Sequence, residues 1–352
     1  MGDEQPLGEL LCCGLNSFKT EEEIKQSIPI TMKIEEQNNY TIALDLGGTI
    51  IKIGLLNRGQ LIDRSEIKAQ SASSLDAQLP ELEKAIGKIL LSNQLQANNV
   101  LGIGFSFAGL VDSSQNRILS TNQKYEGATE TDLVAWARDK WDWPFFAEND
   151  ARMSLLGEWQ YGIGKNSSDL VLLTFGTGIG SAVLINGQLL KGRHFQAGNL
   201  GGHSVVNPWG TDCTCGGKGC VESEASTWRL PSLLREHPKF SESAFKDEEV
   251  LDFKALFDHA GKNDQVAKEV LDRCFAVWSA AIITMIHSFD PEVIILSGGI
   301  MKSASVILPV LQQEVNQRAW TPWGKVQLIK AQFPDSAALY GADYLVRSSV
   351  NR

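Results

Sequence analysis

The chain has 352 residues, of which 43% are hydrophobic, and it carries a formal net charge of −10 with a pI of about 5.1. This length and apolar content predict a soluble globular protein with one large core or two medium ones. The acidic balance argues against nucleic acid or an anionic membrane as the main partner and favours a small-molecule function. The cysteines, read as reduced thiols, predict a cytoplasmic protein, and we expect no membrane span.

Residues 1–38 are polar and mixed in charge, and we interpret them as an N-terminal arm or accessory helix. Thr20 and Glu23 have the spacing of a capping box at a helix start. The arm is short for a complete winged-helix DNA reader and lacks a basic recognition helix. A DNA-binding role for it is therefore not favoured.

Residues 40–56 read as an apolar strand, a glycine turn and a second apolar strand. Gly47 and Gly48 can adopt positive φ and leave backbone N–H groups free to cradle phosphate oxygens. Asp45, at the end of the first strand, is placed to meet a phosphate-bound Mg²⁺ through water. The alternative is an ordinary tight hairpin, because a glycine pair alone is weak evidence.

The next segments alternate between helix and strand, which is the pattern of an α/β fold. Apolar periodicity predicts a helix over 76–94 and a buried strand from 100 that runs into a glycine turn by 111. Residues 112–122 read as a loop, 133–141 as a helix and 145–147 as a short strand.

The strand at 145–147 is followed by Glu148, Asn149 and Asp150, which precede a helical run. A carboxylate and an amide at a strand end lie where open α/β sheets place their ligands. The alternative is that Asp150 serves only as the N-cap of the following helix.

Residues 170–185 repeat the strand, glycine turn and strand, with Thr174, Gly176, Thr177 and Gly178 at the turn. This repeat predicts two related domains that each offer a phosphate-binding turn. A further buried strand within 292–300 ends in Gly298 and Gly299, which would allow a purine to pack against backbone. Taken singly, each turn could be a plain turn.

Four residues have the pattern of a structural zinc site. Cys213, Cys215 and Cys220 lie within eight positions and His203 lies ten residues upstream, so they offer a closed tetrahedral set with no position for water. The alternative is three free cysteines beside an unrelated histidine. Cys274 falls in a long amphipathic helix over 264–289 and reads as a core residue.

These pieces resemble the ROK family of sugar kinases and related repressors over about residues 40–348. The resemblance rests on DLGGT at 45–49, AGLVD at 108–112, END at 148–150, FGTGIGS at 175–181, the His and Cys motif at 203–222, and SGGI at 297–300. It implies an actin-like, hexokinase-like (RNase H-like) pair of α/β domains with the active site between them. The implied boundaries are 39–150 plus about 335–352 for the first domain and 151–334 for the second, which holds the zinc loop at 203–220.

The resemblance implies an ATP-dependent sugar kinase in which Asp150 takes the proton from a sugar hydroxyl. The residues that it places around the sugar are Asn149, Gly109, Asn199, His203 and Glu222. The residues that it places around ATP and Mg²⁺ are Asp45, Gly47, Gly48, Thr49, Lys52, Gly176, Thr177, Gly178, Gly298 and Gly299. Structural Zn²⁺ would be held by His203 and the three cysteines, and family members commonly form homodimers.

One difference from the family's usual motif concerns the residues that contact the sugar. The family usually has GE(I/L)GH before the zinc histidine, whereas here the run from Gly198 to His203 has Asn199 in place of Glu and one added glycine. An amide donates as well as accepts, so the recognised hydroxyl pattern is expected to differ. The alternatives to a kinase are a sugar-sensing regulator of the same family and a non-catalytic sugar-binding protein.

Overall fold

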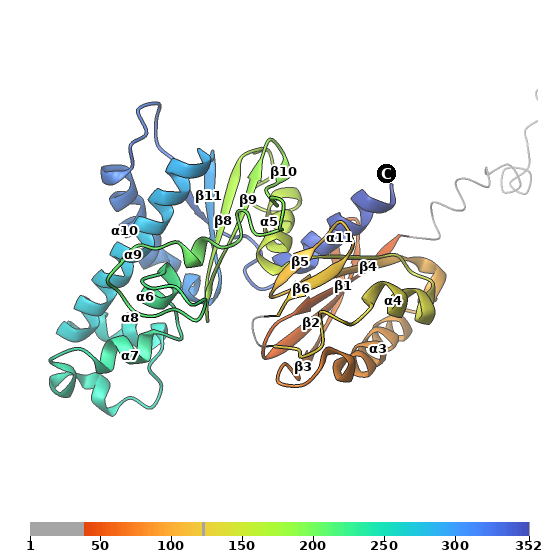
Figure 1. Cartoon of the computed structure of the whole chain (residues 1–352), viewed down its shortest axis with the longest axis horizontal. Helices are drawn as coiled ribbons and strands as arrows, with labels where there is room; N and C mark the ends of the chain where they lie inside the picture. The colour runs from red at the N-terminus through yellow and green to blue at the C-terminus, as the bar shows by residue number, and fades with distance from the viewer. Residues whose placement is uncertain (1–38, 122–123, 352) are drawn as a thin grey trace, which may run out of the picture. The chain divides into compact units, whose positions relative to one another are not determined.

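Two five-stranded mixed sheets form the framework of the protein in the computed structural model, which describes residues 39–121 and 124–351 (Figure 1). The predicted arm, with Thr20 and Glu23, lies outside the described residues. The first sheet has the order β3-β2-β1-β4-β7, with antiparallel pairing among β1 to β3 and parallel pairing of β4 with β1 and β7. Its strands are β1 (Tyr40–Leu46), β2 (Ile50–Asn57), β3 (Gln60–Lys68), β4 (Val100–Phe107) and β7 (Phe145–Asn149).

The second sheet repeats this topology, with the order β10-β9-β8-β11-β12 and the same succession of antiparallel and parallel pairs. Its strands are β8 (Leu170–Phe175), β9 (Ile179–Ile185), β10 (Gln188–Leu189), β11 (Val293–Ser297) and β12 (Gln327–Lys330). The glycine turns after β1 and after β8 therefore occupy the same place in the two sheets, as the repeated sequence pattern predicted.

Helices cover both sheets and contribute most of the buried apolar side chains outside the strands. On the first sheet, α3 contacts β2 and β3, and α4 contacts β7. On the second sheet, α9 contacts α6, α7, α8 and α10. These helices are α3 (Leu75–Ser92), α4 (Leu133–Trp141), α6 (Val221–Ala225), α7 (Leu230–Arg235), α8 (Phe253–Gly261), α9 (Gln265–Phe289) and α10 (Ala304–Arg318). Short 3₁₀ helices are η1 (Ala97–Asn99), η2 (Gly201–His203), η3 (Phe240–Glu242), η4 (Ala244–Asp247) and η5 (Gly299–Ser303).

Helix α9 is the one described helix that is long and apolar enough to cross a membrane by length and composition. Of its most apolar window, 56% is buried inside the structure. Trp278, Ile282 and Cys274 of α9 belong to the core of the second sheet. This burial makes α9 a core helix in the structure, and it raises the pKa of the Cys274 thiol to about 12, which agrees with the predicted core role.

Two helices connect the sheets. Helix α5 (Asp150–Gln160) follows the first sheet and contacts β8 and β9, whereas α11 (Ala337–Val350) follows the second sheet and contacts β1 and β4 (Figure 1). The two helices also pack on each other, and a Cβ on Gly341 would lie 1.8 Å from the Met153 carbonyl oxygen, so only glycine fits there. The domain boundaries at 150 and about 335 stay a prediction, because residues 39–352 form one compact unit.

The expectation of a loop over 112–122 was wrong in part. Strand β6 (Arg117–Ser120) pairs with β5 (Leu110–Asp112) in a separate two-stranded sheet. Only Ile118 of β6 is buried, so the apolar alternation that reveals a strand is too short to detect. Strands β3 and β12 were also not anticipated; β3 has no fully buried residue.

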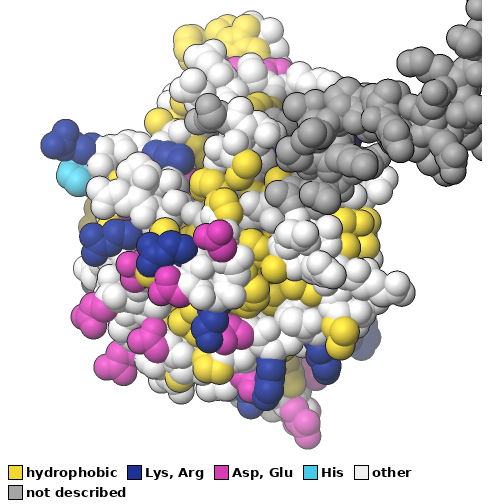
Figure 2. All heavy atoms as spheres, turned by 90° about the vertical axis from the view of Figure 1, so that its right-hand side faces the viewer, with side chains coloured by type: hydrophobic (Ala, Val, Ile, Leu, Met, Phe, Trp, Pro, Cys, Tyr) yellow, Lys and Arg dark blue, Asp and Glu magenta, His cyan; other side chains and the backbone are white. Residues whose placement is uncertain are grey.

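Charged side chains of both signs are interspersed on the face of the molecule that Figure 2 shows. Ion pairs join Lys140 of α4 to Glu83 of α3 at 2.9 Å and Lys84 to Glu81 at 3.3 Å.

Candidate functional site

A cavity of about 440 Å³ brings together most of the predicted site residues. It is lined by the two glycine turns, the corner between β7 and α5, and the segment before the metal loop. The predicted residues that line it are Gly47, Gly48, Gly109, Asn149, Asp150, Gly176, Thr177, Gly178, Asn199, His203, Glu222 and Gly298. Asp45, Thr49, Lys52 and Gly299 lie outside this lining.

The corner between β7 and α5 places Asp150 in the cavity. Asn149 is the N-cap of α5, and its Oδ1 accepts from the backbone N–H groups of Ala151 at 3.1 Å and Arg152 at 3.3 Å. Its Nδ2 donates to the Gly109 carbonyl and to Asp150 Oδ1, each at 2.9 Å. The alternative that Asp150 is the cap is therefore wrong: Asn149 caps the helix, which leaves Asp150 as the first helical residue.

The surroundings of Asp150 favour proton uptake at mildly acidic pH. Burial, followed by the nearby charge of Asp45, raises the pKa of Asp150 to about 6. Hydrogen bonds from the Ala151 N–H and the Asn149 amide and the charge of Lys124 act in the opposite direction. The carboxylate is therefore mainly ionised at neutral pH, with a pKa well suited to general-base catalysis.

The first glycine turn is held from behind by two hydroxyl groups. The Tyr125 hydroxyl donates to the Gly47 carbonyl at 2.7 Å, and the Ser71 hydroxyl donates to the Gly48 carbonyl at 2.6 Å. The N–H groups of Gly47 and Gly48 have no acceptor in the described part of the chain. With the carbonyls fixed, these N–H groups can donate hydrogen bonds to an anion in the cavity.

Asp45 lies beneath this turn, outside the cavity lining. Its Oδ1 accepts from the Ser106 hydroxyl at 2.8 Å, and its Oδ2 pairs with Lys52 at 3.4 Å. The residue that was predicted to meet Mg²⁺ through water therefore has a carboxylate with a fixed orientation next to the first glycine turn. Lys52 is thereby occupied by Asp45.

The second glycine turn has the same backbone arrangement with different supports. The carbonyls of Gly176 and Thr177 accept from the N–H groups of Thr227 at 3.1 Å and Trp228 at 3.3 Å. The N–H groups of Thr177 and Gly178 have no acceptor among the residues that the structure describes.

The Glu222 carboxylate also supports the second turn. Its Oε2 accepts from the Ile179 N–H at 2.8 Å, and its Oε1 accepts from Trp228 Nε1 at 3.4 Å. Glu222 thus lines the cavity while it holds the first residue of β9. Gly298 approaches from β11 with φ 94°, and a Cβ there would lie 2.3 Å from the Phe175 carbonyl, so glycine is required.

The predicted metal ligands form one cluster. The ligand atoms of His203, Cys213, Cys215 and Cys220 all lie within 4.8 Å of one another. His203 Nδ1 is 3.5 Å from Cys213 Sγ, and Cys215 Sγ is 3.7 Å from Cys220 Sγ. Tetrahedral zinc bonds of about 2.3 Å to sulfur and about 2.1 Å to nitrogen bring ligand atoms to roughly 3.5–3.8 Å of one another. The donor set therefore fits Zn²⁺ with no position left for water.

His203 links this cluster to the cavity, because its Nδ1 faces Cys213 while the residue lines the cavity wall. The segment before it is anchored to β9 by Ser181, whose hydroxyl accepts from the Gly201 N–H at 2.7 Å and donates to the Gly198 carbonyl at 2.8 Å. Asn199 Oδ1 is buried and has no hydrogen-bond partner in the described part of the chain. Asn199 is thus a polar group of the cavity wall that is free to bind a ligand.

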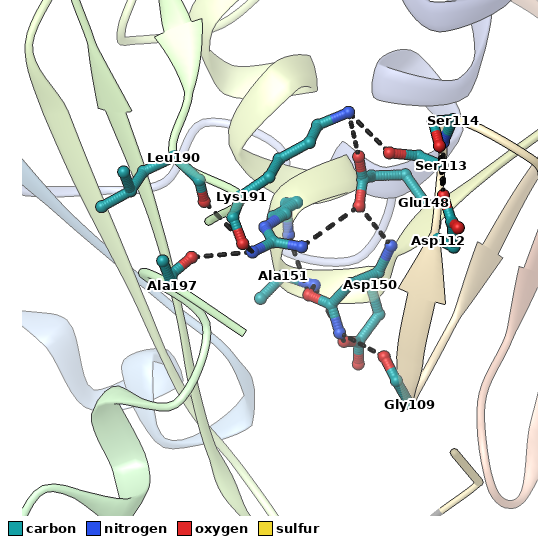
Figure 3. A network of polar contacts seen from close by, with 12 residues as sticks. Gly109, Asp112, Ser113, Ser114, Glu148, Asp150, Ala151, Leu190, Lys191 and Ala197 are labelled. Atoms are coloured by element: carbon teal, nitrogen blue, oxygen red, sulfur yellow. Dashed lines mark hydrogen bonds and ion pairs between the residues drawn. The ribbon is translucent and has the colours of Figure 1, made fainter. Parts of the chain in front are cut away.

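A buried ion network connects Asp150's helix to the same segment (Figure 3). Arg152 and Glu148 are both fully buried and lie 3.5 Å apart, and Lys191 reaches Glu148 at 3.0 Å and the Ser113 hydroxyl at 2.6 Å. Arg152 also donates to the Ala197 carbonyl at 2.7 Å. This network fixes the strand end that carries Asn149 and Asp150 against the residues that precede Asn199.

Several residues of the site were not predicted from the sequence. Gln196, Lys124, Ser120 and Thr174 line the cavity. The sequence placed Thr174 at the second glycine turn without predicting it as a site residue, and the structure places it near the end of β8, just before that turn. Lys124 follows β6 in a stretch without apolar periodicity, and nothing in the sequence alone brings it to the first turn.

Comparison with known proteins gives concordant matches. The sequence model of the ROK family matches residues 41–349. The chain is 29% identical over 315 residues to a glucokinase of Thermotoga maritima, covering 88% of this chain and 98% of that protein. It is 25% identical to a xylose repressor of Bacillus spizizenii, covering 90% and 79% of the two chains.

Among solved structures, a ROK family glucokinase from Streptomyces griseus in complex with glucose and AMPPNP superposes with a TM-score of 0.73 at 24% identity, covering 88% of this chain and 99% of that one. Likeness at this level concerns the fold. It confirms the predicted two-domain, actin-like α/β architecture.

Proposed function

The chain belongs to the ROK family, and from this premise we propose that it is a kinase that transfers the γ-phosphoryl group of ATP to a hydroxyl of a hexose or N-acetylhexosamine. The observation that carries the proposal is the position of Asp150. Its carboxylate lines one cavity together with two glycine turns whose N–H groups are unoccupied in the described part of the chain. A base and two anion-binding turns around one space are the parts that phosphoryl transfer requires.

In the proposed reaction Asp150 accepts the proton of the attacking hydroxyl. The pKa of about 6 keeps it ionised at neutral pH and close enough to neutrality to accept a proton in the transition state. Asn149 fixes the carboxylate through its amide, so proton removal takes place at a defined atom. The protein otherwise contributes mainly positioning and charge neutralisation.

ATP would lie against the two turns. Gly47, Gly48 and Thr49 would hold phosphate oxygens from one side, and Gly176, Thr177 and Gly178 would hold them from the other. Gly298 and Gly299 would pack against the adenosine. Asp45 would meet Mg²⁺ through water, with Lys52 fixing the Asp45 carboxylate.

The sugar would occupy the part of the cavity near Asp150. The groups proposed to bind its hydroxyls are Asn149, Gly109, Asn199, His203 and Glu222. Zn²⁺ held by His203 and the three cysteines would supply no Lewis acid for the reaction, because its four positions are filled. Its proposed task is to fix the loop that carries His203.

The test is an ADP-release assay with MgATP on a panel of hexoses and N-acetylhexosamines, run on the wild type and on Asp150→Asn. General-base removal costs about 10²–10⁴-fold in rate, so we expect sugar-dependent turnover to fall by about 10³-fold. Sugar affinity, measured by calorimetry, should change little. Turnover that survives in Asp150→Asn would remove Asp150 as the base, and no sugar-dependent turnover in the wild type would remove the kinase.

A sugar-sensing regulator is the second candidate, since the chain is similar to a xylose repressor as well as to a glucokinase. Retention on heparin together with sugar-sensitive DNA binding, without ADP release, would select it. A homodimer stays a prediction from the resemblance, and a monomer by light scattering would remove it.

A further inference from the structure

Among the described lysines and arginines, Lys124 is the one that lines the cavity. The other cations close to the site are already paired: Lys52 with Asp45 at 3.4 Å and Lys191 with Glu148 at 3.0 Å. In the part of the chain that the structure describes, the Lys124 ammonium group makes neither an ion pair nor a hydrogen bond. A single unpaired cation therefore faces the space where a highly anionic substrate is proposed to bind.

Lys124 lies close to the first glycine turn and lines the same cavity as Asp150. Its Nζ is 2.8 Å from the place that a Cβ on Gly48 would occupy, so the ammonium group lies directly over the turn. Its charge also acts on Asp150, although the two do not form an ion pair. The ammonium group and the free N–H groups of the turn thus face the same part of the cavity, on the side of the base.

We propose that Lys124 is a catalytic residue whose ammonium group binds the γ-phosphoryl group of ATP and neutralises its charge during transfer. This inference rests on the proposed kinase function. In the transfer, the sugar hydroxyl gives its proton to Asp150 and its oxygen forms the new bond to the γ-phosphorus. The bond from that phosphorus to the β,γ-bridging oxygen breaks, and the electron pair leaves with ADP. Lys124 keeps its proton throughout and contacts an equatorial oxygen of the transferred group.

The backbone N–H groups alone do not neutralise the negative charge of the γ-phosphoryl group during transfer. The free N–H groups of the two turns carry only partial charges, and the chain has a formal net charge of −10. Phosphoryl transfer depends on neutralising the charge that is spread over the equatorial oxygens. A full positive charge above the Gly48 turn and facing Asp150 supplies that neutralisation at the point where the sugar oxygen and the phosphorus meet.

A binding experiment separates a γ-phosphoryl contact from a general effect on the nucleotide. Calorimetry with Mg²⁺ and either AMPPNP or ADP would be run on the wild type, Lys124→Gln, Lys124→Arg and Lys88→Gln. Lys88 is an exposed lysine of α3, so its variant loses the same charge away from the cavity. We expect Lys124→Gln to weaken AMPPNP about tenfold and ADP less than about twofold, and Lys124→Arg to recover most of the loss.

Kinetics provide the second readout. We expect Lys124→Gln to lower kcat about 100-fold with little change in the KM for sugar, while Lys88→Gln behaves as the wild type. Equal weakening of AMPPNP and ADP, or a kcat within about threefold of the wild type, would overturn the role of Lys124. If the wild type binds both nucleotides but phosphorylates no sugar, the kinase proposal and the catalytic role of Lys124 both fail, and the nucleotide comparison decides only whether Lys124 binds the γ-phosphoryl group. If the wild type binds neither nucleotide, both proposals fail.

Discussion

The two glycine turns share one backbone device and differ in what supports it. In both, carbonyl groups are hydrogen-bonded to other segments, and two N–H groups of each turn have no acceptor among the described residues. The first turn is held by the hydroxyls of Tyr125 and Ser71, which come from distant segments. The second turn is held by backbone N–H groups of Thr227 and Trp228 and by Glu222.

Because of this difference, we expect the two turns to have different roles. Glu222 lies in α6, which begins directly after Cys220, one of the predicted metal ligands, so we expect the geometry of the second turn to depend on the metal loop. The first turn has no such link, but the charged side chains Asp45, Lys52 and Lys124 surround it. We infer that the metal loop maintains the shape of the second turn, whereas the first turn sets the electrostatics at Asp150.

The largest expected effect comes from breaking the metal loop. Cys215→Ser removes one ligand, so we expect zinc content to fall and kcat/KM to drop about 100-fold as the second turn loosens. Hydrogen exchange should accelerate at Ile179, Thr227 and Trp228 and remain unchanged at Gly47. Zinc analysis and exchange mass spectrometry would measure both effects.

Cys274→Ala is the matched control, since it removes a buried cysteine that lies outside the metal cluster. It should lose some stability through the cavity that it creates but retain zinc and activity. Normal zinc content in Cys215→Ser would undo the ligand assignment. Equal acceleration of exchange at both turns would undo the proposed division between them.

The second prediction concerns pH and tests whether the first turn sets the electrostatics at Asp150. Asp150 acts as a base only when ionised, and its pKa is about 6, so kcat/KM should fall tenfold per pH unit below that value. The charged groups that act on its pKa are Asp45, which raises it, and Lys124, which lowers it. Both belong to the surroundings of the first turn.

Asp45→Asn should therefore move the fall in kcat/KM on the acidic side of the pH profile to lower pH, because removing a neighbouring negative charge makes Asp150 easier to ionise. Glu222→Gln should leave the pH at which kcat/KM falls unchanged, even if it lowers the rate. Glu222 is not among the groups that shift the pKa of Asp150. If the acidic side of the pH profile moves in Glu222→Gln and stays fixed in Asp45→Asn, the second turn and not the first sets the pKa of Asp150.

The parts of the site that the sequence predicted are those whose residues lie close together in the chain. The predicted metal ligands fall within 203–220 and form one cluster, and Asn149 and Asp150 are adjacent at a strand end, so spacing alone is enough to group them. Even there, sequence could not tell which of the two adjacent residues caps α5, because both side chains can accept from a helix N-terminus. The hydrogen bonds of Asn149 decide it.

The parts that the sequence missed depend on contacts between distant segments. Tyr125 reaches Gly47 across 78 positions. Arg152 reads as the polar face of a helix, yet it is fully buried and bonds to Ala197, 45 positions away. Neither residue belongs to a periodic pattern or a local motif, so their roles follow only from the packing of the two sheets.

The smallest expected effect removes one hydroxyl behind the first turn. Burial, followed by the charge of Asp45, raises the pKa of Tyr125 to about 12, so its hydroxyl keeps its proton and donates to Gly47. Tyr125→Phe should cost about 1 kcal/mol in the free energy of unfolding. Because the Gly47 carbonyl is then free to turn, the affinity for MgADP should fall about three- to fivefold with the KM for sugar unchanged.

Tyr161→Phe makes the same chemical change at a place that supports neither turn. Its hydroxyl donates to buried Asp343 at 3.0 Å, so its loss should cost at least as much in unfolding free energy and leave nucleotide affinity unchanged. Chemical denaturation and calorimetry on both variants separate the two effects. If both variants weaken MgADP equally, the loss reflects general destabilisation and the hydroxyl has no specific role in the turn. If only Tyr125→Phe weakens it, the first turn depends on a side chain 78 positions away, just as the second depends on the segment that follows the metal loop.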